Sequence, residues 1–327
     1  MLKKIFSKQK LICFLLVLIL LNLLKINSFA QSSPKKTTTL TLGLNWKPEP
    51  QFGGFYEAQI AGEFTQRQLE VKILEGGSGT PTVQMLANNK IDYGIVSAEE
   101  LIIANEKNPT NKLIALYAVY KTNPQMILTH DERGFKNLKD IFQNDGTLAV
   151  QQGLSYFQFL KKLYQPLKVR LVPYLGGIGN FQNDKNFSQQ GFVNSENLLA
   201  EKAGLKIKIF LVAESGFNPY TTVLATQAER LKKSAPQVQQ MREAVRAGWT
   251  RYLESPSASN KFMLSLNKAM DISVMEKAAT AQKDLIEVKG EKLGEMKLLR
   301  WKKLQEQLKE LGLIKQLDDP QEYFLKQ

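Results

Sequence analysis

A glycine-rich turn at residues 76–81, with the sequence Gly-Gly-Ser-Gly-Thr-Pro, is the motif most suggestive of chemistry. Glycines let backbone N–H groups approach a ligand closely, while Thr80 can cap a following helix and Pro81 suits its first position. Exposed N–H groups and the helix dipole favour an anion such as a carboxylate, sulfonate or phosphate. The alternative is a plain strand-to-helix turn, and the sequence alone weighs the two equally. The lysine of a P-loop is absent, so nucleotide hydrolysis is not indicated.

A group of aromatic and polar residues follows the first predicted strand. Trp46 stands at its end, where open α/β sheets bind ligands, and an indole there can stack on a planar ring. Asn45 and Glu49 flank Trp46 and could hydrogen-bond ring nitrogens or an amine, and Ser97 follows a later strand. The alternatives are a half-buried core tryptophan, a surface position for Glu49 and a helix cap at Ser97. Tyr56 has an aromatic neighbour on the same predicted helix, so one of the two belongs to the core.

A second set of candidates lies in the later part of the chain. These residues occupy strand-to-helix turns, a strand end and a predicted connection between units: Gln152, Ser155, Tyr174, Glu214, Asn218 and Tyr220. Ser78, Gly79 and Thr80 of the glycine turn complete the predicted ligand-binding set. No single member carries the prediction by itself.

Residue types that perform catalysis or bind metals are scarce. The one cysteine, Cys13, lies in an apolar N-terminal run, which leaves the remainder without disulfides, thiol catalysis or cysteine-ligated metals. The one histidine, His130, stands beside Asp131 and Glu132 in what we expect to be a surface segment, and no second histidine completes a metal site. Nothing orients that histidine for nucleophilic catalysis. We therefore predict no catalytic residue, no metal and no cofactor.

Strand and helix patterns alternate around these residues. A first series of strands is predicted at residues 40–46, 69–74, 91–96 and 113–119. A second series is predicted at residues 126–129, 148–151, 169–173 and 207–212. Helical patterns separate most of them. This βαβ order implies an α/β fold with parallel-rich sheets and helices on both faces.

Two stretches interrupt the alternation. Residues 176–190 are poor in apolar groups and rich in glycine, asparagine and glutamine, so we predict a long loop there. Strand signals fade after Pro219. A helical C-terminal segment then follows, with helices predicted at residues 235–253, 257–267, 271–287 and 292–311.

Two α/β units followed by helices suggest two lobes. The chain is expected to cross between them near residues 120–126 and 208–216. We therefore assign residues 31–122 and 213–327 to a discontinuous first lobe, and residues 123–212 to a second lobe.

The first thirty residues have the pattern of a secretory signal peptide. Four lysines precede residue 11, an apolar run covers residues 11–24, and Ser28 and Ala30 are the small residues of a cleavage site. The run has about 14 residues, whereas a membrane-spanning helix needs roughly 20, so cleavage after Ala30 is favoured over anchoring. This leader predicts a periplasmic location.

The formal charge of +13 includes five lysines from residues 1–30, so the cleaved chain carries about +8. The remaining basic residues are dispersed, and Lys232-Lys233 and Lys302-Lys303 lie on helical patterns beside glutamate and glutamine. This indicates solvated helix faces rather than a nucleic-acid surface, although a positive field can attract an anionic solute.

An ordered set of short motifs carries a family resemblance. Residues 46–50, Trp-Lys-Pro-Glu-Pro, and residues 54–59, Gly-Phe-Tyr-Glu-Ala-Gln, resemble the start of thiamine-precursor (pyrimidine) binding proteins of ABC transporters, whose relatives bind sulfonates and nitrate. The resemblance continues at residues 62–64, 69–71, 76–79, 91–95, 212–220 and 248–256, and is weakest over residues 176–195.

The resemblance implies a type II-like, two-lobed periplasmic binding protein fold and a monomeric protein. Such a protein captures a small, planar and polar or anionic molecule by lobe closure and delivers it to an ABC permease in the inner membrane. A sulfonate, nitrate or flavin-type ligand, or a ligand-sensing subunit, are the alternatives. The pyrimidine-synthase branch of the superfamily has a cysteine-rich motif and a substrate-side histidine, so the absence of such cysteines implies binding rather than synthesis.

Cleavage after Ala30 is directly testable. Mass spectrometry of the exported protein is expected to show a mature N-terminus at Gln31, because the small residues at 28 and 30 fit the signal-peptidase site. An exported protein that retains Met1 would contradict the prediction.

Overall fold

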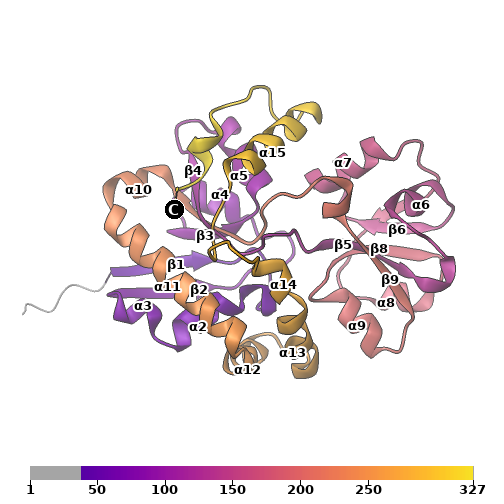
Figure 1. Ribbon diagram of the computed structural model, residues 1–327, viewed down its shortest axis with the longest axis horizontal. Coiled ribbons are helices and arrows are strands. Elements are labelled where there is room, and N and C mark those ends of the chain that lie inside the picture. The colour runs from indigo at the N-terminus through magenta and orange to yellow at the C-terminus, as the bar shows by residue number, and fades with distance from the viewer. Residues whose placement is uncertain (1–37, 327) are drawn as a thin grey trace, which may run out of the picture. The chain divides into compact units, whose positions relative to one another are not determined.

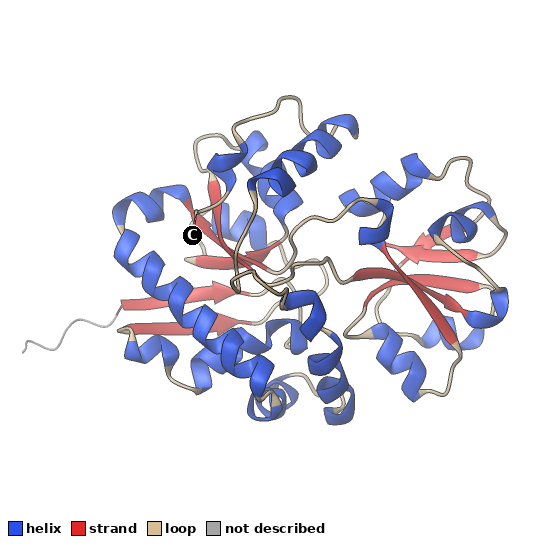
Figure 2. Cartoon of the chain, viewed as in Figure 1, coloured by secondary structure: helices blue, strands red, loops and turns tan. Residues whose placement is uncertain are grey.

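The protein is described by a computed structural model over residues 38–326 (Figure 1). The predicted signal peptide, residues 1–30, lies outside the described residues. The fold is α/β and contains two five-stranded sheets, each with helices packed around it (Figure 2). Both sheets are mixed, and in each of them four strands run in one direction while the fifth runs against them, so the expected parallel-rich α/β fold is confirmed.

The first sheet has the spatial strand order β2-β1-β3-β10-β4. Its strands are β1 (Thr38–Gly43), β2 (Leu69–Leu74), β3 (Tyr93–Val96), β4 (Leu113–Ala118) and β10 (Val223–Gln227). β1 pairs in parallel with β2 and β3, while β10 runs antiparallel to β3 and β4. β3 and β4 are buried along their whole length, because helices cover both faces of the sheet.

Strand β10 corrects the expectation that strands end before Pro219. It is a five-residue segment placed between β3 and β4, although it is the last strand in the sequence. Leu224 packs with one core cluster, whereas Val223 and Ala225 pack with the cluster on the other face. An apolar run this short is ambiguous by periodicity, and only its position between two buried strands makes it a strand.

The second sheet has the order β7-β6-β8-β5-β9. Its strands are β5 (Gln125–His130), β6 (Thr147–Val150), β7 (Arg170–Pro173), β8 (Phe187–Phe192) and β9 (Ile207–Leu211). β6 pairs in parallel with β7 and β8, while β5 runs antiparallel to β8 and β9.

Helix α8 (Gly179–Asn183) and the first four residues of β8 lie in the stretch 176–190 that we expected to be a loop. β8 is the central strand of its sheet, and its polar side chains are buried with hydrogen-bond partners. The Ser188 hydroxyl donates to Thr129 Oγ1 over 3.0 Å, and Gln189 Nε2 donates to the Gly177 carbonyl over 2.9 Å. Hydropathy could not reveal this strand, because satisfied polar groups rather than apolar ones fill its interior positions.

The helices of the first half are short. Those beside the first sheet are η1 (Pro50–Phe52), α2 (Gly53–Ile60), α3 (Glu63–Gln66), α4 (Thr82–Ala87) and α5 (Ala98–Lys107). Those beside the second sheet are η2 (Asp131–Arg133), α6 (Leu138–Gln143), α7 (Ser155–Leu163), α8, α9 (Glu196–Lys202) and η3 (Val212–Ser215).

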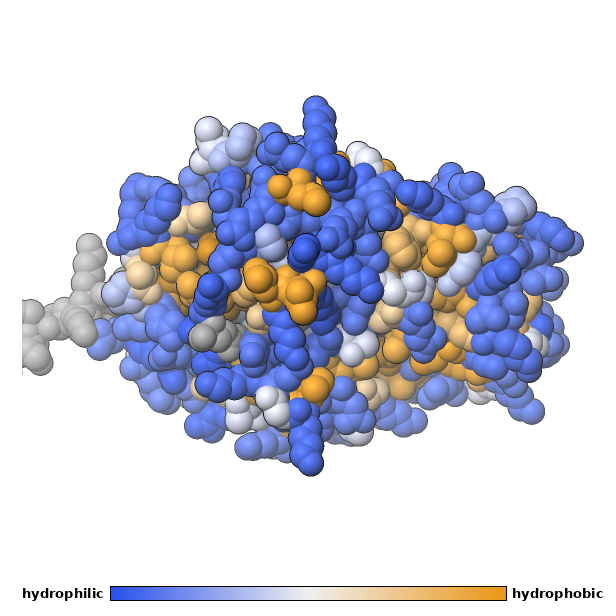
Figure 3. Space-filling view, turned by 45° about the horizontal axis from the view of Figure 1, so that its top comes forward, coloured by the Kyte–Doolittle hydropathy of each residue, from blue (hydrophilic) through white to orange (hydrophobic). Residues whose placement is uncertain are grey.

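The C-terminal segment is helical, as expected from its pattern. Its helices are α10 (Ala228–Lys233), α11 (Ala235–Glu254), α12 (Ser257–Leu266), α13 (Ile272–Ala281), α14 (Lys283–Ile286), α15 (Leu298–Glu310) and η4 (Pro320–Tyr323). None of the helices within residues 38–326 has both the length and the hydropathy of a membrane span. The face in Figure 3 is mostly hydrophilic with scattered apolar patches, as expected for amphipathic helices around a buried core.

Close packing of α11 on α2 fixes the segment before α2. A Cβ atom at Gly248 would lie 2.2 Å from the Gly54 carbonyl oxygen, and one at Gly54 would lie 2.3 Å from the buried ring of Trp249. Both positions therefore require glycine, because no side chain fits between the helices. This contact anchors α2, and with it the loop that carries Trp46 and Glu49.

Two connecting segments join the sheets, residues 119–124 after β4 and residues 212–222 after β9. Arg300 of α15 holds both of them. Its guanidinium donates to the carbonyls of Lys121, Asn218 and Pro219 and to the Asn218 side chain, and it stacks on the Tyr220 ring at 3.9 Å. The Asn218 side chain in turn accepts the Asn123 N–H.

Arg300→Ala is expected to lower the free energy of unfolding by about 3–5 kcal/mol, because it leaves several shielded carbonyls without donors. Arg300→Lys should recover little of this loss, since an ammonium group cannot match the fork of a guanidinium. Lys302→Ala, on an exposed position of the same helix, is the control and should change stability by less than about 0.5 kcal/mol. Urea unfolding followed by circular dichroism measures all three. Equal stability of the Arg300→Ala and Lys302→Ala variants would contradict the role of Arg300 in holding the two connecting segments.

Candidate ligand-binding site

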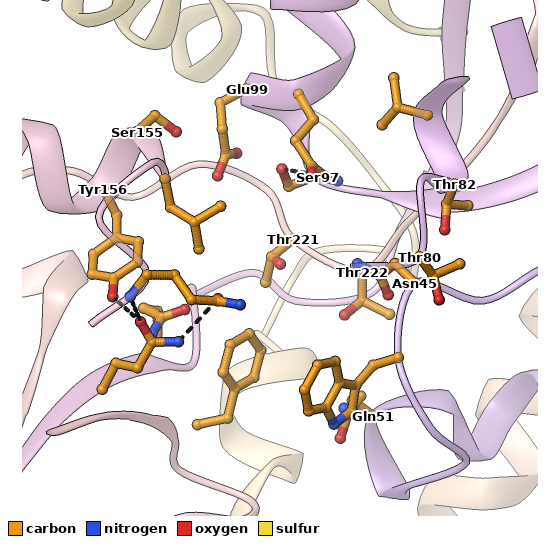
Figure 4. A pocket seen from close by; sticks show the side chains of 18 of the residues that line it. Asn45, Gln51, Thr80, Thr82, Ser97, Glu99, Ser155, Tyr156, Thr221 and Thr222 are labelled. Carbon is orange, nitrogen blue, oxygen red and sulfur yellow. Dashed lines mark hydrogen bonds between the residues drawn. The ribbon is translucent and has the colours of Figure 1, made fainter. Parts of the chain in front are cut away.

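A cavity of about 600 Å³ is lined by residues from both sheets (Figure 4). On the first-sheet side, the lining residues follow the carboxyl ends of β1, β2 and β3, and on the second-sheet side they follow β6, β7 and β8. Loops after parallel strands meet at one edge of a sheet, which is where open α/β folds bind ligands. The cavity therefore lies where two such edges contribute to one space.

Trp46 and Glu49 form one part of the wall. Trp46 Nε1 donates to Glu49 Oε1 over 3.2 Å, and Gln51 Nε2 lies 3.5 Å from Glu49 Oε2. The loop is held from behind, because Asn267 donates to the Pro48 carbonyl and Gln282 to the Pro50 carbonyl. Burial, aided by the nearby Glu196 carboxylate, raises the pKa of Glu49 to about 7.

Tyr174 and Glu196 form the second-sheet counterpart. The Tyr174 hydroxyl donates to one oxygen of Glu196, and the Phe192 N–H donates to the other over 2.8 Å. Burial raises the pKa of Glu196 above its usual range. Because Glu196 also raises the pKa of Glu49, the two carboxyl groups lie close enough to repel each other when both are ionised.

The turn after β3 supplies a third acidic group. Ser97 and Glu100 form a capping box at the start of α5, with the Ser97 N–H donating to Glu100 over 2.9 Å. The neighbouring Glu99 turns its carboxyl into the cavity, where Oε2 is shielded from solvent and has no hydrogen-bond partner. Burial and then the Glu100 charge raise the pKa of Glu99 to about 8.

A glutamine and tyrosine network completes the second-sheet side. Gln190 Oε1 accepts from the Gln151 N–H and from the Tyr156 hydroxyl, each over 2.6 Å. Gln190 Nε2 donates to the Gln151 side chain over 3.0 Å. Figure 4 shows Tyr156 of this network on one side of the cavity and Asn45 and Thr80 on the other.

Thr222 lines the cavity in an unusual backbone conformation. Its φ is +52°, a region that β-branched residues rarely adopt and that costs on the order of 1–3 kcal/mol. The Val119 N–H donates to its carbonyl over 3.2 Å and helps to hold it there. Such strain concentrates at binding sites, so Thr222 supports the assignment of this cavity.

The glycine turn lacks the helix cap that its sequence suggested, and its surroundings offer little support for an anion. α4 begins at Thr82 with Pro81 at its N-cap and no side-chain cap, so Thr80 does not cap it. Gly76 serves packing, because a Cβ atom there would lie 2.3 Å from the Leu44 carbonyl oxygen. Gly77 and Gly79 are open to the cavity. A helix of six residues has only a small dipole to attract an anion. The residues that line the cavity include four glutamates and one lysine, Lys107, so acidic groups outnumber basic ones.

The structure brings eight of the predicted ligand residues to this cavity. They are Asn45, Trp46, Glu49, Gly79, Thr80, Ser97, Ser155 and Tyr174. Ser78 lies in the same turn without lining the cavity. Ser97 does both things considered for it, since it lines the cavity and also caps α5.

The other five predicted residues lie elsewhere. Tyr56 is in the core against Phe262, and Gln152 borders a separate surface depression near α7. Glu214 is in η3, outside the cavity lining. Asn218 and Tyr220 hold Arg300, so their place near a connection between the sheets serves structure.

Several lining residues were not anticipated. Beyond Glu99 and Glu196, they include Gln51, Gln125, Gln190, Thr221 and Thr222. Glu196 and Gln190 lie in or next to β8, so they could not be placed without that strand. Glu99 could have been found, because it follows the same strand end as Ser97.

His130 is buried rather than on the surface. It stacks on Phe181 with 4.0 Å between ring centroids, and Nε2 lies 2.8 Å from the Phe181 carbonyl oxygen. Over residues 38–326, no cluster of three histidine, cysteine, aspartate or glutamate side chains could hold a metal ion.

The fold is that of periplasmic binding proteins. A family model described as NMT1/THI5 like matches residues 49–153 and 165–259, together more than half of the chain. The chain belongs to this family. The suspected relationship to binding proteins of this kind is thereby confirmed. No curated protein matches the sequence.

Solved structures agree with the fold. The aliphatic sulphonate-binding protein SsuA from Escherichia coli has a TM-score of 0.66 at 13% identity, over 88% of this chain and 92% of that one. A Candida albicans protein with the generic periplasmic binding protein fold has a TM-score of 0.57 at 16% identity, over 86% and 93%. The desulfurization enzyme DszB has a TM-score of 0.60 at 11% identity, over 88% and 96%. At these identities the likeness establishes the fold alone.

Glu49→Gln tests the electrostatics of the cavity. Because the pKa of Glu49 is raised in the folded state, wild-type stability falls as pH rises from about 4.5 to about 7, where the unfolded chain ionises first. Glutamine removes this penalty, so the variant should be more stable by about 2–3 kcal/mol at pH 8 and hardly at all at pH 4.

The measurement is urea unfolding at several pH values. Glu201→Gln, at an exposed position of α9, is the control and should show no pH-dependent gain. If Glu49→Gln raised the free energy of unfolding by the same amount at pH 4 and at pH 8, the raised pKa of Glu49 would be contradicted.

Proposed function

We propose that the protein is the extracytoplasmic ligand-binding component of an ABC import system. The observation that carries this proposal is the cavity built from strand ends of two separate sheets, with Trp46 and two buried carboxyl groups facing it. A polar cavity shared by two α/β units suits capture and release by closure of two lobes. Family membership supports the same function.

The lobes of this proposal follow the two sheets. Residues 31–122 and 213–327 form the first lobe and residues 123–212 the second, joined by the two segments that Arg300 holds. Closure would bring the Trp46 loop and the Tyr174–Glu196 pair onto a ligand from opposite sides. The protein would act as a monomer in the periplasm, after cleavage of its leader, and deliver the ligand to a permease.

The ligand we propose is a planar, nitrogen-containing ring such as a thiamine pyrimidine precursor. Trp46 offers an aromatic face, and Glu49 and Glu196 offer acceptors for an amino group or a ring N–H. SsuA, a structural relative, binds aliphatic sulphonates, which makes a sulfonate the competing ligand class. The glutamates in the cavity disfavour that class, because an anion would be repelled by each carboxylate that ionises as the pH rises, whereas an amino group or a cation would be attracted by it.

Enzymatic activity is the competing function, since one structural relative is a desulfurization enzyme. The single histidine is remote from the cavity and stacked on Phe181, so this chain has no imidazole base beside a ligand there. Incubation with a bound ligand, followed by mass spectrometry, should return the ligand unchanged.

A sensing role is a further alternative to transport. The two are distinguished by whether the protein stimulates ligand uptake by a permease and its ATPase in vesicles.

Calorimetry with three probes tests the ligand class: 4-amino-5-hydroxymethyl-2-methylpyrimidine, ethanesulfonate and nitrate. Only the aminopyrimidine is expected to bind. Trp46→Ala should weaken its binding about 10- to 100-fold through loss of ring stacking, whereas Trp46→Phe should keep most of the affinity.

Gly77→Ala separates ligand contact from folding. Its φ is not positive and a Cβ atom there meets no neighbour, so the variant should fold normally. A loss of affinity in a stable Gly77→Ala protein would place the ligand against this turn. Binding of ethanesulfonate instead of the pyrimidine, or unchanged affinity in Trp46→Ala, would refute the proposed ligand position.

A further inference from the structure

Glu99 is a glutamate of the cavity wall with one carboxyl oxygen that no internal contact satisfies. It is the second residue of α5, and its carboxyl is directed into the cavity (Figure 4). Its Oε2 atom is shielded from solvent and has no hydrogen-bond partner. The neighbouring Glu100 already forms the capping box with Ser97, so the helix start does not require Glu99.

A shielded carboxyl oxygen without a partner is costly. Leaving such a group unsatisfied destabilises a protein by roughly 1–3 kcal/mol, and more when the group is charged. Glutamine or an apolar residue would remove this cost. A residue kept in such a position is best explained by a partner that arrives with the ligand.

The acidic groups of the cavity fall into two separate pairs. The pKa of Glu49 responds to Glu196, whereas the pKa of Glu99 responds to Glu100 and to the more distant guanidinium of Arg300. That guanidinium is occupied by backbone carbonyls, so it does not neutralise Glu99 through a direct contact. The cavity thus offers one acidic group beside Trp46 and another at the start of α5.

The cavity is also larger than one ring requires. Its volume of about 600 Å³ is roughly four times that of an engineered cavity that holds one benzene, about 150 Å³. A single pyrimidine stacked on Trp46 would leave much of this space unfilled. The remaining space extends to the Glu99 side, which lies among the lining residues.

Building on the proposed function, we propose that Glu99 forms a second subsite that binds the positively charged group of a ligand whose heteroaromatic ring lies on Trp46. The ligand class is therefore a cationic heteroaromatic molecule, with an amino-substituted ring at Glu49 and Glu196 and a cation at Glu99. A neutral ring alone occupies only the first subsite.

Proton linkage supports this assignment. With its pKa raised to about 8 by burial and by Glu100, Glu99 is mostly protonated at pH 7 when no ligand is bound. A cation favours the ionised carboxylate, so its binding releases a proton from Glu99. The groups that face this carboxyl are the Ser97 hydroxyl, the Glu100 carboxyl and the Arg300 guanidinium.

The test compares thiamine, which joins an aminopyrimidine to a cationic thiazolium, with 4-amino-5-hydroxymethyl-2-methylpyrimidine, which has the ring alone. Wild-type protein should bind thiamine at least about tenfold more tightly than the pyrimidine, because one additional charge-assisted contact contributes about that much affinity. Glu99→Gln should abolish this advantage and leave binding of the pyrimidine unchanged within about twofold. Glu276→Gln, at an exposed position of α13, is the control for both ligands.

Two further readouts separate ligand binding from a structural role. Glu99→Gln should be more stable than wild type at pH 9, because the amide removes a shielded charge and can keep the contact with Ser97, whereas a glutamate whose charge is needed for folding would lose stability on replacement. Calorimetry at pH 7 in buffers of different ionisation enthalpy should show more proton release on thiamine binding for wild type than for Glu99→Gln.

The outcomes distinguish this inference from the proposed function. If the pyrimidine binds but thiamine binds no more tightly, or if Glu99→Gln weakens both ligands equally, the second subsite is wrong and the proposed function stands. If neither pyrimidine compound binds and ethanesulfonate does, the proposed ligand class is wrong and the inference falls with it. A Glu99→Gln protein that is less stable at pH 9 would also overturn the inference.

Discussion

The shared cavity depends on how the two connecting segments are held together. Both pass beside Arg300, whose guanidinium donates to carbonyls of each segment and stacks on Tyr220. A rigid, planar donor can satisfy several carbonyls at once, which a flexible ammonium cannot. A second network adds to this constraint, because buried Asn194 donates to both Tyr120 and Gln282, and Gln282 holds the Pro50 carbonyl. The position of the Trp46 loop is thus linked to residues that follow β8.

The cavity contains groups that oppose folding. Glu49, Glu99 and Glu196 all have pKa values raised by burial, so at neutral and higher pH each destabilises the ligand-free protein as it ionises. Thr222 adds backbone strain. Stability must therefore come from elsewhere, and the close contact of α11 with α2 is one source, with Trp249 fully buried between them. Binding sites are commonly the places where a protein gives up stability in this way.

The chemistry of the cavity changes the interpretation of the glycine turn. As a sequence, the turn indicated an anion site, because glycines and a following helix often hold one. In the structure, Pro81 rather than Thr80 precedes α4, that helix is short, and the opposing walls carry carboxyl groups. The turn's open glycines are better suited to close approach of a ring or of carbonyl acceptors. The charge of a ligand is thus decided by what faces the turn.

The sequence by itself determined the α/β class, most strands and helices, and the residues at the ends of β1, β2 and β3, because apolar periodicity and strand-end position are local properties. Trp46, Glu49 and Ser97 were found in that way. Strands β8 and β10 were decided by tertiary structure, since one has buried polar residues with distant partners and the other is a short segment inserted between two strands. On the second-sheet side, Ser155 and Tyr174 were found from the sequence, whereas Gln190 and Glu196 became visible only once β8 was placed. The roles of Asn218 and Tyr220 likewise followed only from their contacts with Arg300, about 80 residues further along the chain.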